Sequence, residues 1–294
     1  MPTVDANGIT INYTVEGAGP PLILLHGATS SPLEDWAAQR PAFRQAFRIY
    51  LVDARGHAGT KWDARDGFSN EMLVADLLAF ADALGLDTFH LVGFSMGAMT
   101  SMRFAATYPD RLRTAIICGI DVFREPRASV ARRLMDPARI LREEPEWAKE
   151  LDRRHGPVQG DGAWQNLLPA IAADVANQPL PTPAELRNIR LPTLLVYGDR
   201  DVFVPADHAV AIYRQLPDAR LLIAPNCPHQ VMVYQPALFN QAAATFYRST
   251  EDEARRRAER GATVGGGAAA FNPVASHSDE PNETADAADP FSNW

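Results

Sequence analysis

The sequence predicts an α/β fold, in which a mostly parallel sheet carries helices on both faces and a helical segment is inserted into the chain. Apolar runs of strand length alternate with segments of helical periodicity in the first half, which is the pattern of a parallel sheet. This alternation stops between about residues 122 and 190 and then resumes. A chain of 294 residues with 46% hydrophobic content can bury one large core, so we expect one main domain.

The first half of the chain contains the clearest strand and helix signals. We expect buried strands at residues 21–25, 47–52, 89–92 and 114–118. Gly85 stands where a helix would end after four apolar residues at helical spacing, which are Leu73, Leu77, Phe80 and Leu84. A second helix, after residue 97, is expected to run to about Thr107, because Pro109 stops it.

The second half of the chain divides into a helical insert, the end of the sheet and a polar tail. Charged, proline-punctuated helical pieces replace the strand pattern first, then two strands and a last helix are expected at 191–197, 219–224 and about 236–247. The remainder is too polar to bury a core, although residues 251–260 are compatible with a short helix. The expected units are an α/β core at 1–121 and 191–250, a helical cap at 122–190 and a mostly disordered tail at 251–294.

Charge and cysteine content exclude several classes of protein. The net charge of −8, from 36 acidic and 28 basic residues, offers no basic surface to nucleic acid. The two cysteines, Cys118 and Cys227, are too few for a disulfide framework and lack the paired spacing of a zinc site. The chain begins without a signal-peptide pattern, and no run approaches the roughly 20 apolar residues of a membrane span. We therefore expect a cytoplasmic protein with neither nucleic-acid nor membrane partners and with neither a metal nor an organic cofactor. The sequence leaves its oligomeric state open.

The strongest chemical signal is the segment Gly93-Phe94-Ser95-Met96-Gly97. It stands between an apolar strand and a helix, where two glycines permit a sharp turn that exposes the Ser95 hydroxyl beyond the sheet. A serine hydroxyl is a weak nucleophile at neutral pH and needs a base, a group that orients the base, and donors for an oxyanion. We predict that Ser95 is a nucleophile. The alternative is a glycine-rich turn whose serine caps a helix.

Position along the chain selects a base for Ser95 among the seven histidines. His229 lies on a loop after the last expected strand and before the final helix, with an acidic residue upstream. Other histidines lie in loops that different motifs explain, in a strand, in the expected cap or in the tail, namely His26, His57, His90, His155 and His277. We therefore predict that His229 is the base.

From about residue 5 to 248 the chain resembles the α/β-hydrolase superfamily, in particular its serine esterase- and lactonase-like members with a helical cap. Besides the Ser95 turn, three motifs carry the resemblance: His26-Gly27-Ala28, Asp53-Ala54-Arg55-Gly56-His57-Ala58-Gly59-Thr60, and Gly198-Asp199-Arg200-Asp201 with His229. The resemblance implies an oxyanion hole formed by the backbone N–H groups of Ala28 and Met96. The second motif is expected to be structural. It departs from the family pattern at Ala58 and Thr60, as the third does at Pro228.

The resemblance also implies which carboxylate orients His229. Asp201 precedes it by 28 residues and gives the order serine, aspartate, histidine that this fold uses. Asp199 lies nearer the strand end, but the family pattern places the acid at the second aspartate. Asp121 is a rival, because some members carry the acid there, and a solvated turn aspartate is the other interpretation of Asp201. We predict a Ser95, Asp201 and His229 triad.

The leading functional hypothesis is a serine hydrolase that cleaves a small carboxylic ester or lactone through an acyl-enzyme on Ser95. Serine at this turn argues against the dehalogenase and epoxide-hydrolase branches, which use an aspartate there. One alternative is hydrolysis of a carbon–carbon bond in ring-cleavage diketones, and another is a low-turnover ligand-binding receptor on a hydrolase scaffold. For an acidic substrate the cap offers candidate pocket residues, although a solvated helix face also explains the arginines: Trp147, Trp164, Arg132, Arg133, Arg153 and Arg154.

Overall fold

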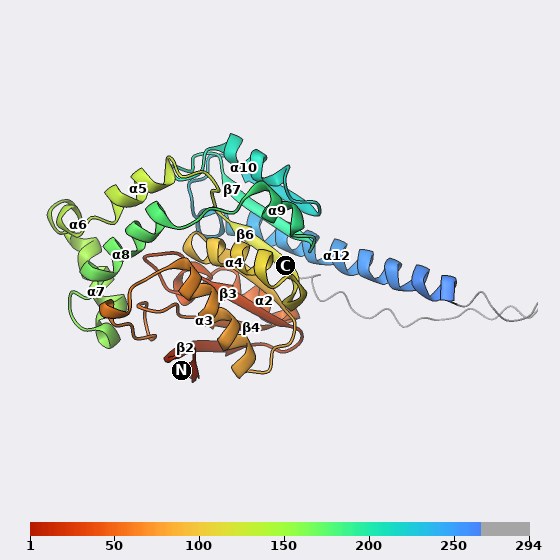
Figure 1. Ribbon diagram of the computed structural model, residues 1–294, viewed down its shortest axis with the longest axis horizontal. Coiled ribbons are helices and arrows are strands. Elements are labelled where there is room, and N and C mark those ends of the chain that lie inside the picture. Colours follow the sequence, from red (N-terminus) through yellow and green to blue (C-terminus); the bar gives the residue numbers. More distant parts are fainter. Residues whose placement is uncertain (266–294) are drawn as a thin grey trace, which may run out of the picture.

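The structure is a computed structural model that describes residues 1–265. One eight-stranded sheet runs through it in the order β1-β2-β4-β3-β5-β6-β7-β8 (Figure 1). The strands are β1 (Thr3–Ala6), β2 (Ile9–Glu16), β3 (Pro21–Leu25), β4 (Arg48–Val52), β5 (Phe89–Phe94), β6 (Leu112–Cys118), β7 (Thr193–Gly198) and β8 (Ala219–Ala224). Strand β2 pairs antiparallel with β1 and β4, and the other neighbours are parallel. The predicted mostly parallel α/β sheet is therefore confirmed.

Helices cover both faces of this sheet, because successive side chains of a strand point to opposite faces. In β3, Ile23 and Leu25 join one buried cluster, whereas Leu22 and Leu24 join the other. The first cluster packs against α3 (Asn70–Ala83), α4 (Met96–Thr107), α9 (Pro183–Asn188) and α10 (Ala206–Tyr213). The second packs against α1 (Pro32–Asp35), α2 (Arg40–Ala46), α11 (Val231–Tyr234) and α12 (Pro236–Gly265). Short 3-10 turns occur at Ala64–Asp66 and Pro109–Arg111.

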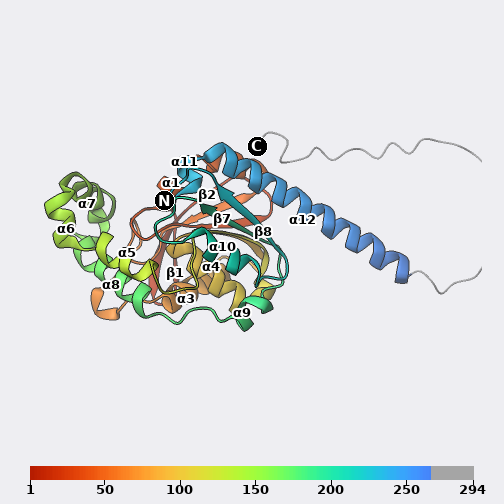
Figure 2. The same ribbon diagram turned by 90° about the horizontal axis from the view of Figure 1, so that it is seen from above.

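Residues 122–190 form helices and contain no strand in this structure. Four of these helices enclose a third buried cluster: α5 (Arg127–Leu134), α6 (Pro137–Glu143), α7 (Pro145–Gln159) and α8 (Trp164–Asn177). Figures 1 and 2 show the four together on one side of the sheet. Helix α9 instead packs on the main core through Leu186. The segment is helical as expected, and the cap as a separate unit with these boundaries stays a prediction.

The last helix is longer than the sequence pattern indicates. Helix α12 continues from Pro236 to Gly265, so the first part of the segment we expected to be mostly disordered is helical. Charge pairing on the helix explains the difference: Arg220 of β8 lies 3.0 Å from Glu253, and Arg255 lies 2.7 Å from Asp252 one turn away. The rest of the expected tail, residues 266–294, lies outside the described residues. Among residues 1–265, none of the helices combines the length and apolarity needed to cross a membrane.

Candidate active site

Ser95 lies at the sharp turn between β5 and α4. Its φ of 51° and ψ of −108° are strained for a residue with a side chain. The turn is held because the Ser95 N–H donates to the Cys118 carbonyl at 2.9 Å. Glycines flank it because side chains would not fit: a Cβ on Gly93 would lie 2.3 Å from the Gly97 carbonyl oxygen, and one on Gly97 would lie 2.7 Å from Leu25. Both glycines of the motif are therefore required by close backbone approach.

His229 and Asp201 are in direct contact. Nδ1 of His229 lies 2.6 Å from Oδ2 of Asp201. Asp201 follows β7 and His229 follows β8, so both lie at the carboxyl ends of neighbouring parallel strands. The other oxygen of the fully buried Asp201 carboxylate accepts the N–H groups of Phe203 at 2.8 Å and Val204 at 3.1 Å. These bonds fix the carboxylate so that it points at Nδ1.

The second nitrogen of His229 faces a small internal cavity. Nε2 is buried and has no hydrogen-bond partner within residues 1–265. The ring is held by Phe94 and Phe203, whose centroids lie 4.9 and 4.6 Å away. A Cβ on Gly119 would lie 2.7 Å from Cε1 of the histidine, so only glycine leaves room for the ring. Ser95 and His229 both line this cavity of about 40 Å³.

The other candidate acids have different partners. Asp121 is fully buried, and its Oδ2 lies 2.8 Å from Nδ1 of His208, so it is not bonded to His229. Burial raises the pKa of Asp121, and the His208 hydrogen bond opposes that shift. Asp199 accepts the Cys227 N–H at 3.0 Å and thereby fixes the loop that carries His229. Of the three aspartates, only Asp201 is bonded to the predicted base.

The two amides expected to form the oxyanion hole border the same cavity, because Ala28 and Met96 both line it. Neither N–H donates to another group in the described part of the chain. The loop that carries Ala28 is tied to the nucleophile turn, since the Gly97 N–H donates to the His26 carbonyl at 3.1 Å. Two free amides at a buried position can stabilise negative charge that develops on a substrate oxygen.

Asp35 supports this loop and was not predicted from the sequence. Its Oδ2 accepts the Gly27 N–H at 2.8 Å, next to Ala28. The side chain is 3% exposed, and burial raises the pKa of Asp35 to about 6, against the opposing effect of the Gly27 bond. No motif in the sequence marks Asp35, which lies at the end of the short helix α1. Its role becomes visible only in the tertiary structure, where it bonds to the loop at Gly27.

Three buried histidines pack edge to face in a cluster next to the loop. The ring of His57 lies 4.8 Å from that of His26 and 5.4 Å from that of His155. Nε2 of His26 accepts a backbone N–H at 3.0 Å, so its Nδ1 carries the proton and donates to the Gly27 carbonyl at 2.7 Å. Burial lowers the pKa of all three, to about 3 for His155. They are neutral at physiological pH and act as structural supports.

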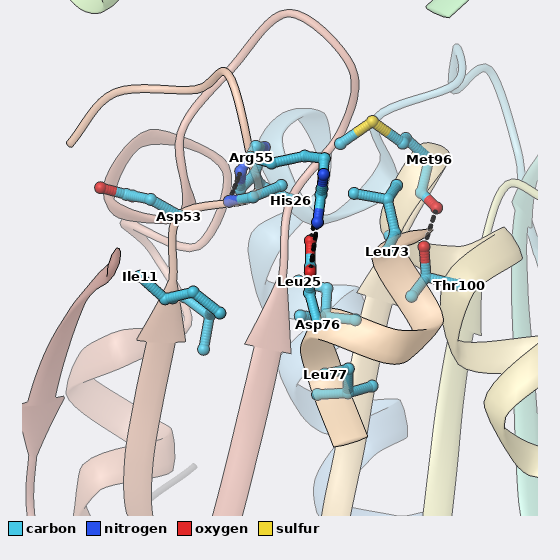
Figure 3. Close-up of a pocket in the computed structure, with 13 residues that line it drawn as sticks. Ile11, Leu25, His26, Asp53, Arg55, Leu73, Asp76, Leu77, Met96 and Thr100 are labelled. Carbon is cyan, nitrogen blue, oxygen red and sulfur yellow. Dashed lines mark hydrogen bonds and ion pairs between the residues drawn. The ribbon is translucent and has the colours of Figure 1, made fainter. Parts of the chain in front are cut away.

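The turn at residues 53–60 packs beside these histidines and encloses a second cavity of about 30 Å³ (Figure 3). In it, Nε of the buried Arg55 donates to Asp76 at 2.7 Å. Ala58 adopts a φ of 41°, a conformation that favours glycine, and its N–H donates to His155 at 3.1 Å. These contacts give the turn the structural role that we expected. Met96 lines both this cavity and the one that contains Ser95.

The helical segment supplies the wall of the Ser95 cavity, through residues that the sequence did not single out. Arg127, Ala131 and Met135 recur every four residues near α5 and line the cavity together. None of the tryptophans and arginines named above as candidate pocket residues is among the residues that line it. Trp164, for example, is buried in the helical cluster instead. The sequence did contain a signal for these residues. Their four-residue spacing places Arg127, Ala131 and Met135 on one face of a helix.

Across residues 1–265, histidines, cysteines and carboxylates do not gather in groups of three or more that could hold a metal ion. The polar groups at the site include a hydroxyl, an imidazole, a carboxylate and two backbone amides, which are groups that can support acyl transfer.

Comparison with known proteins assigns the family. Residues 22–242 match the family described as "Alpha/beta hydrolase family", and the chain belongs to this family. It is 26% identical over 278 residues to a 2-hydroxy-6-oxo-6-phenylhexa-2,4-dienoate hydrolase of Comamonas testosteroni, covering 83% of this chain and 93% of that one. It is likewise 26% identical over 252 residues to a pimeloyl-[acyl-carrier protein] methyl ester esterase of Nitrosomonas europaea, covering 78% and 96%. A solved structure described as an N-acyl homoserine lactone degrading enzyme superimposes with a TM-score of 0.68 at 26% identity, covering 83% of this chain and all of that one. The relatives thus include proteins named as a dienoate hydrolase, a methyl ester esterase and a lactone-degrading enzyme, and the chain is a hydrolase.

Proposed function

We propose that this hydrolase cleaves a small carboxylic ester or lactone through an acyl-enzyme on Ser95. The observation that carries the proposal is the pair His229 and Asp201: Nδ1 of His229 is bonded to Asp201, its buried Nε2 has no hydrogen-bond partner among residues 1–265, and His229 lines the same cavity as Ser95. A strained serine turn and two free backbone amides border the same cavity. The esterase and lactonase names among the relatives support the same class of substrate.

The mechanism follows from the roles of these groups. Nε2 of His229 accepts the Ser95 proton while Oγ attacks the substrate carbonyl, and Asp201 stabilises the imidazolium that forms. The N–H groups of Ala28 and Met96 donate to the carbonyl oxygen as it becomes negative. The imidazolium then protonates the departing alcohol, which leaves Ser95 acylated. A water molecule, deprotonated by His229, attacks the acyl-enzyme and releases the acid.

Replacement of the nucleophile tests this proposal. With p-nitrophenyl acetate as substrate, Ser95→Ala should lose at least about 10⁴-fold in kcat, because no other hydroxyl in this geometry can form the acyl-enzyme. A fluorophosphonate probe should label the wild type at Ser95. The control is Ser129→Ala, which changes an exposed serine of α5 and should leave the rate unchanged. Full activity of Ser95→Ala would refute the assignment.

Carbon–carbon bond hydrolysis is the second candidate. It is favoured by the relative named as a 2-hydroxy-6-oxo-6-phenylhexa-2,4-dienoate hydrolase, which matches 83% of this chain. The wild type would be incubated with that dienoate and, separately, with p-nitrophenyl acetate, methyl esters and lactones. Turnover of the dienoate alone would select this candidate. Fluorophosphonate labelling without turnover of any of these compounds would instead favour a ligand-binding receptor.

We also propose a cytoplasmic location and small-molecule substrates. Both cysteines are free and buried, which suits a reducing compartment. The net charge of −8 favours a small-molecule substrate over nucleic acid. Fluorescence microscopy of the tagged chain in its host would test the location, and a membrane-associated signal would contradict it.

A further inference from the structure

Arg127 is a buried cation in the cavity that contains Ser95. It begins α5, is 8% exposed and lines the cavity together with Ser95 and His229. Burial lowers the pKa of Arg127 to about 10, so the guanidinium is charged at neutral pH. The cavity is therefore lined by a positive charge, that of Arg127, as well as by the candidate nucleophile Ser95.

This guanidinium is poorly satisfied by the protein. Its Nε has no hydrogen-bond partner in the described part of the chain, and one terminal nitrogen reaches the Val175 carbonyl at the long distance of 3.5 Å. Asp121 and Asp174 act on its charge electrostatically, but neither forms an ion pair with it in the described residues. A buried charge without a close counter-ion is costly, and a bidentate carboxylate is the partner that best satisfies an arginine.

The rest of the cavity wall is mixed in character. Apolar side chains such as Met99 and Ile171 line it, and so do two side chains whose buried oxygens have no hydrogen-bond partner among residues 1–265, Oδ1 of Asn70 and Oε1 of Gln178. These oxygens are hydrogen-bond acceptors and do not bind an ionised carboxylate, whereas the Arg127 guanidinium in the same lining can. The cavity of about 40 Å³ is small, which favours a short acyl chain.

We propose that Arg127 binds a carboxylate at the far end of the substrate's acyl group, so that the preferred substrates are short half-esters of dicarboxylic acids or short lactones that carry a free carboxylate. The inference rests on the proposed ester or lactone hydrolysis and specifies its substrate class. Asp174 lines the same cavity and partly offsets the positive charge of Arg127. The expected preference is therefore about tenfold, equivalent to about 1.4 kcal/mol, and not the thousandfold of an uncompensated site.

The test compares two substrates of the same shape. Monomethyl succinate carries a carboxylate where methyl 4-oxopentanoate carries a neutral acetyl group. The wild type should show a kcat/KM at least about tenfold higher for the succinate, mainly through KM. Arg127→Met should reduce this ratio to about one, and Arg127→Lys should restore part of it, because lysine keeps the charge but loses the bidentate fork. The control is Arg132→Met, on the exposed side of the same helix, which should keep the wild-type ratio.

A structural role of Arg127 would give a different result. If Arg127→Met lowered kcat/KM for both substrates in equal proportion, or if the wild type showed no preference, the proposal would be overturned. Circular dichroism and Tm of each variant establish that it is folded. The longer half-ester monomethyl glutarate measures the length of the acyl pocket in the same series.

A binding measurement separates this inference from the proposed function. In the Ser95→Ala protein, succinate should raise Tm more than acetate at equal ionic strength, and the added Arg127→Met change should remove the difference. Succinate binding without hydrolysis of any ester would refute the ester-hydrolase proposal and retain the carboxylate site. Ester hydrolysis with neither substrate preference nor a succinate-specific Tm shift would refute the carboxylate site and retain the hydrolase.

Discussion

Two aspartate–histidine pairs in this protein are built in the same way, and only one faces the cavity of the candidate active site. The tripeptide Asp-Val-Phe occurs at residues 121–123 and again at 201–203, after the parallel strands β6 and β7. In each copy the aspartate accepts the N–H of the phenylalanine, at 2.9 and 2.8 Å. In each copy the carboxylate also binds Nδ1 of a histidine, at 2.8 and 2.6 Å.

The aromatic packing is repeated as well. Phe123 lies 4.2 Å from the ring of His208, and Phe203 lies 4.6 Å from the ring of His229. The difference lies in what the second imidazole nitrogen faces. His229 lines the cavity that contains Ser95, whereas His208 is not among its lining residues. A buried carboxylate–imidazole pair is thus not a catalytic site by itself. It requires a nucleophile on the other side of the ring.

The largest expected difference between the pairs is in their histidines. His229→Gln should reduce kcat for p-nitrophenyl acetate by about 10⁴-fold or more, because no base remains for Ser95. His208→Gln should stay within about threefold of the wild type, because it only removes a structural hydrogen bond. Steady-state rates of both variants show whether catalysis requires His229 but not His208. Equal losses would mean that the two pairs act together and that the distinction is wrong.

A smaller difference is expected for the carboxylates. Asp201→Asn should lower kcat by about 10²- to 10⁴-fold, since an amide does not stabilise the imidazolium and favours the wrong tautomer. Asp121→Asn should change kcat by less than about threefold while lowering the free energy of unfolding by about 1–3 kcal/mol, because a buried hydrogen-bond network is disturbed. Urea denaturation and initial rates, measured on the same samples, give both quantities. A large loss of kcat in Asp121→Asn with normal stability would restore Asp121 as a candidate triad acid.

Asp35 is a further buried carboxylate, and among residues 1–265 it is bonded to a backbone N–H and not to a histidine. The pH dependence of its contribution to stability extends the comparison. Burial raises its pKa to about 6 in the folded protein, from the ordinary value of 3.8 for an aspartate, so the folded state binds more protons between these pH values. The contribution of Asp35 therefore destabilises the fold as pH rises from about 4 to 6, by roughly 3 kcal/mol at about 1.36 kcal/mol per pKa unit. Asp35→Asn keeps an oxygen acceptor for the Gly27 N–H and should remove this part of the slope.

The measurement is the free energy of unfolding at several pH values between 4 and 8 for the wild type and Asp35→Asn. The variant should gain stability relative to the wild type as pH rises. Parallel curves for the two proteins would show that Asp35 does not titrate in this range. Asp5→Asn, at an exposed position of β1, is a suitable control with little expected effect.

Much of the fold was predictable from local signals. Apolar runs gave β3, β4, β5, β6, β7 and β8 to within a few residues, because buried parallel strands must be apolar on both faces. Strands β1 and β2 were not predicted, since β1 has one buried side chain among four residues and most side chains of β2 are only half-buried. The length of α12 was underestimated for a related reason. Its turn at residues 252–255 is charged, with Arg255 paired to Asp252 and Glu253 paired to Arg220, which a hydrophobic pattern does not detect.

The sequence alone determined the parallel sheet, and it predicted the Ser95 turn and His229 as the base, because each depends on neighbouring residues: apolar periodicity, two glycines, and a loop after a strand. The tertiary structure shows that His229 is bonded to Asp201, the aspartate that the family resemblance implied, and only the tertiary structure places Arg127 at the cavity and Asp35 at its loop. The reason is physical. Local pattern fixes which face a side chain occupies, but contacts between residues distant in the chain depend on how strands order in the sheet and how helices pack across their ends.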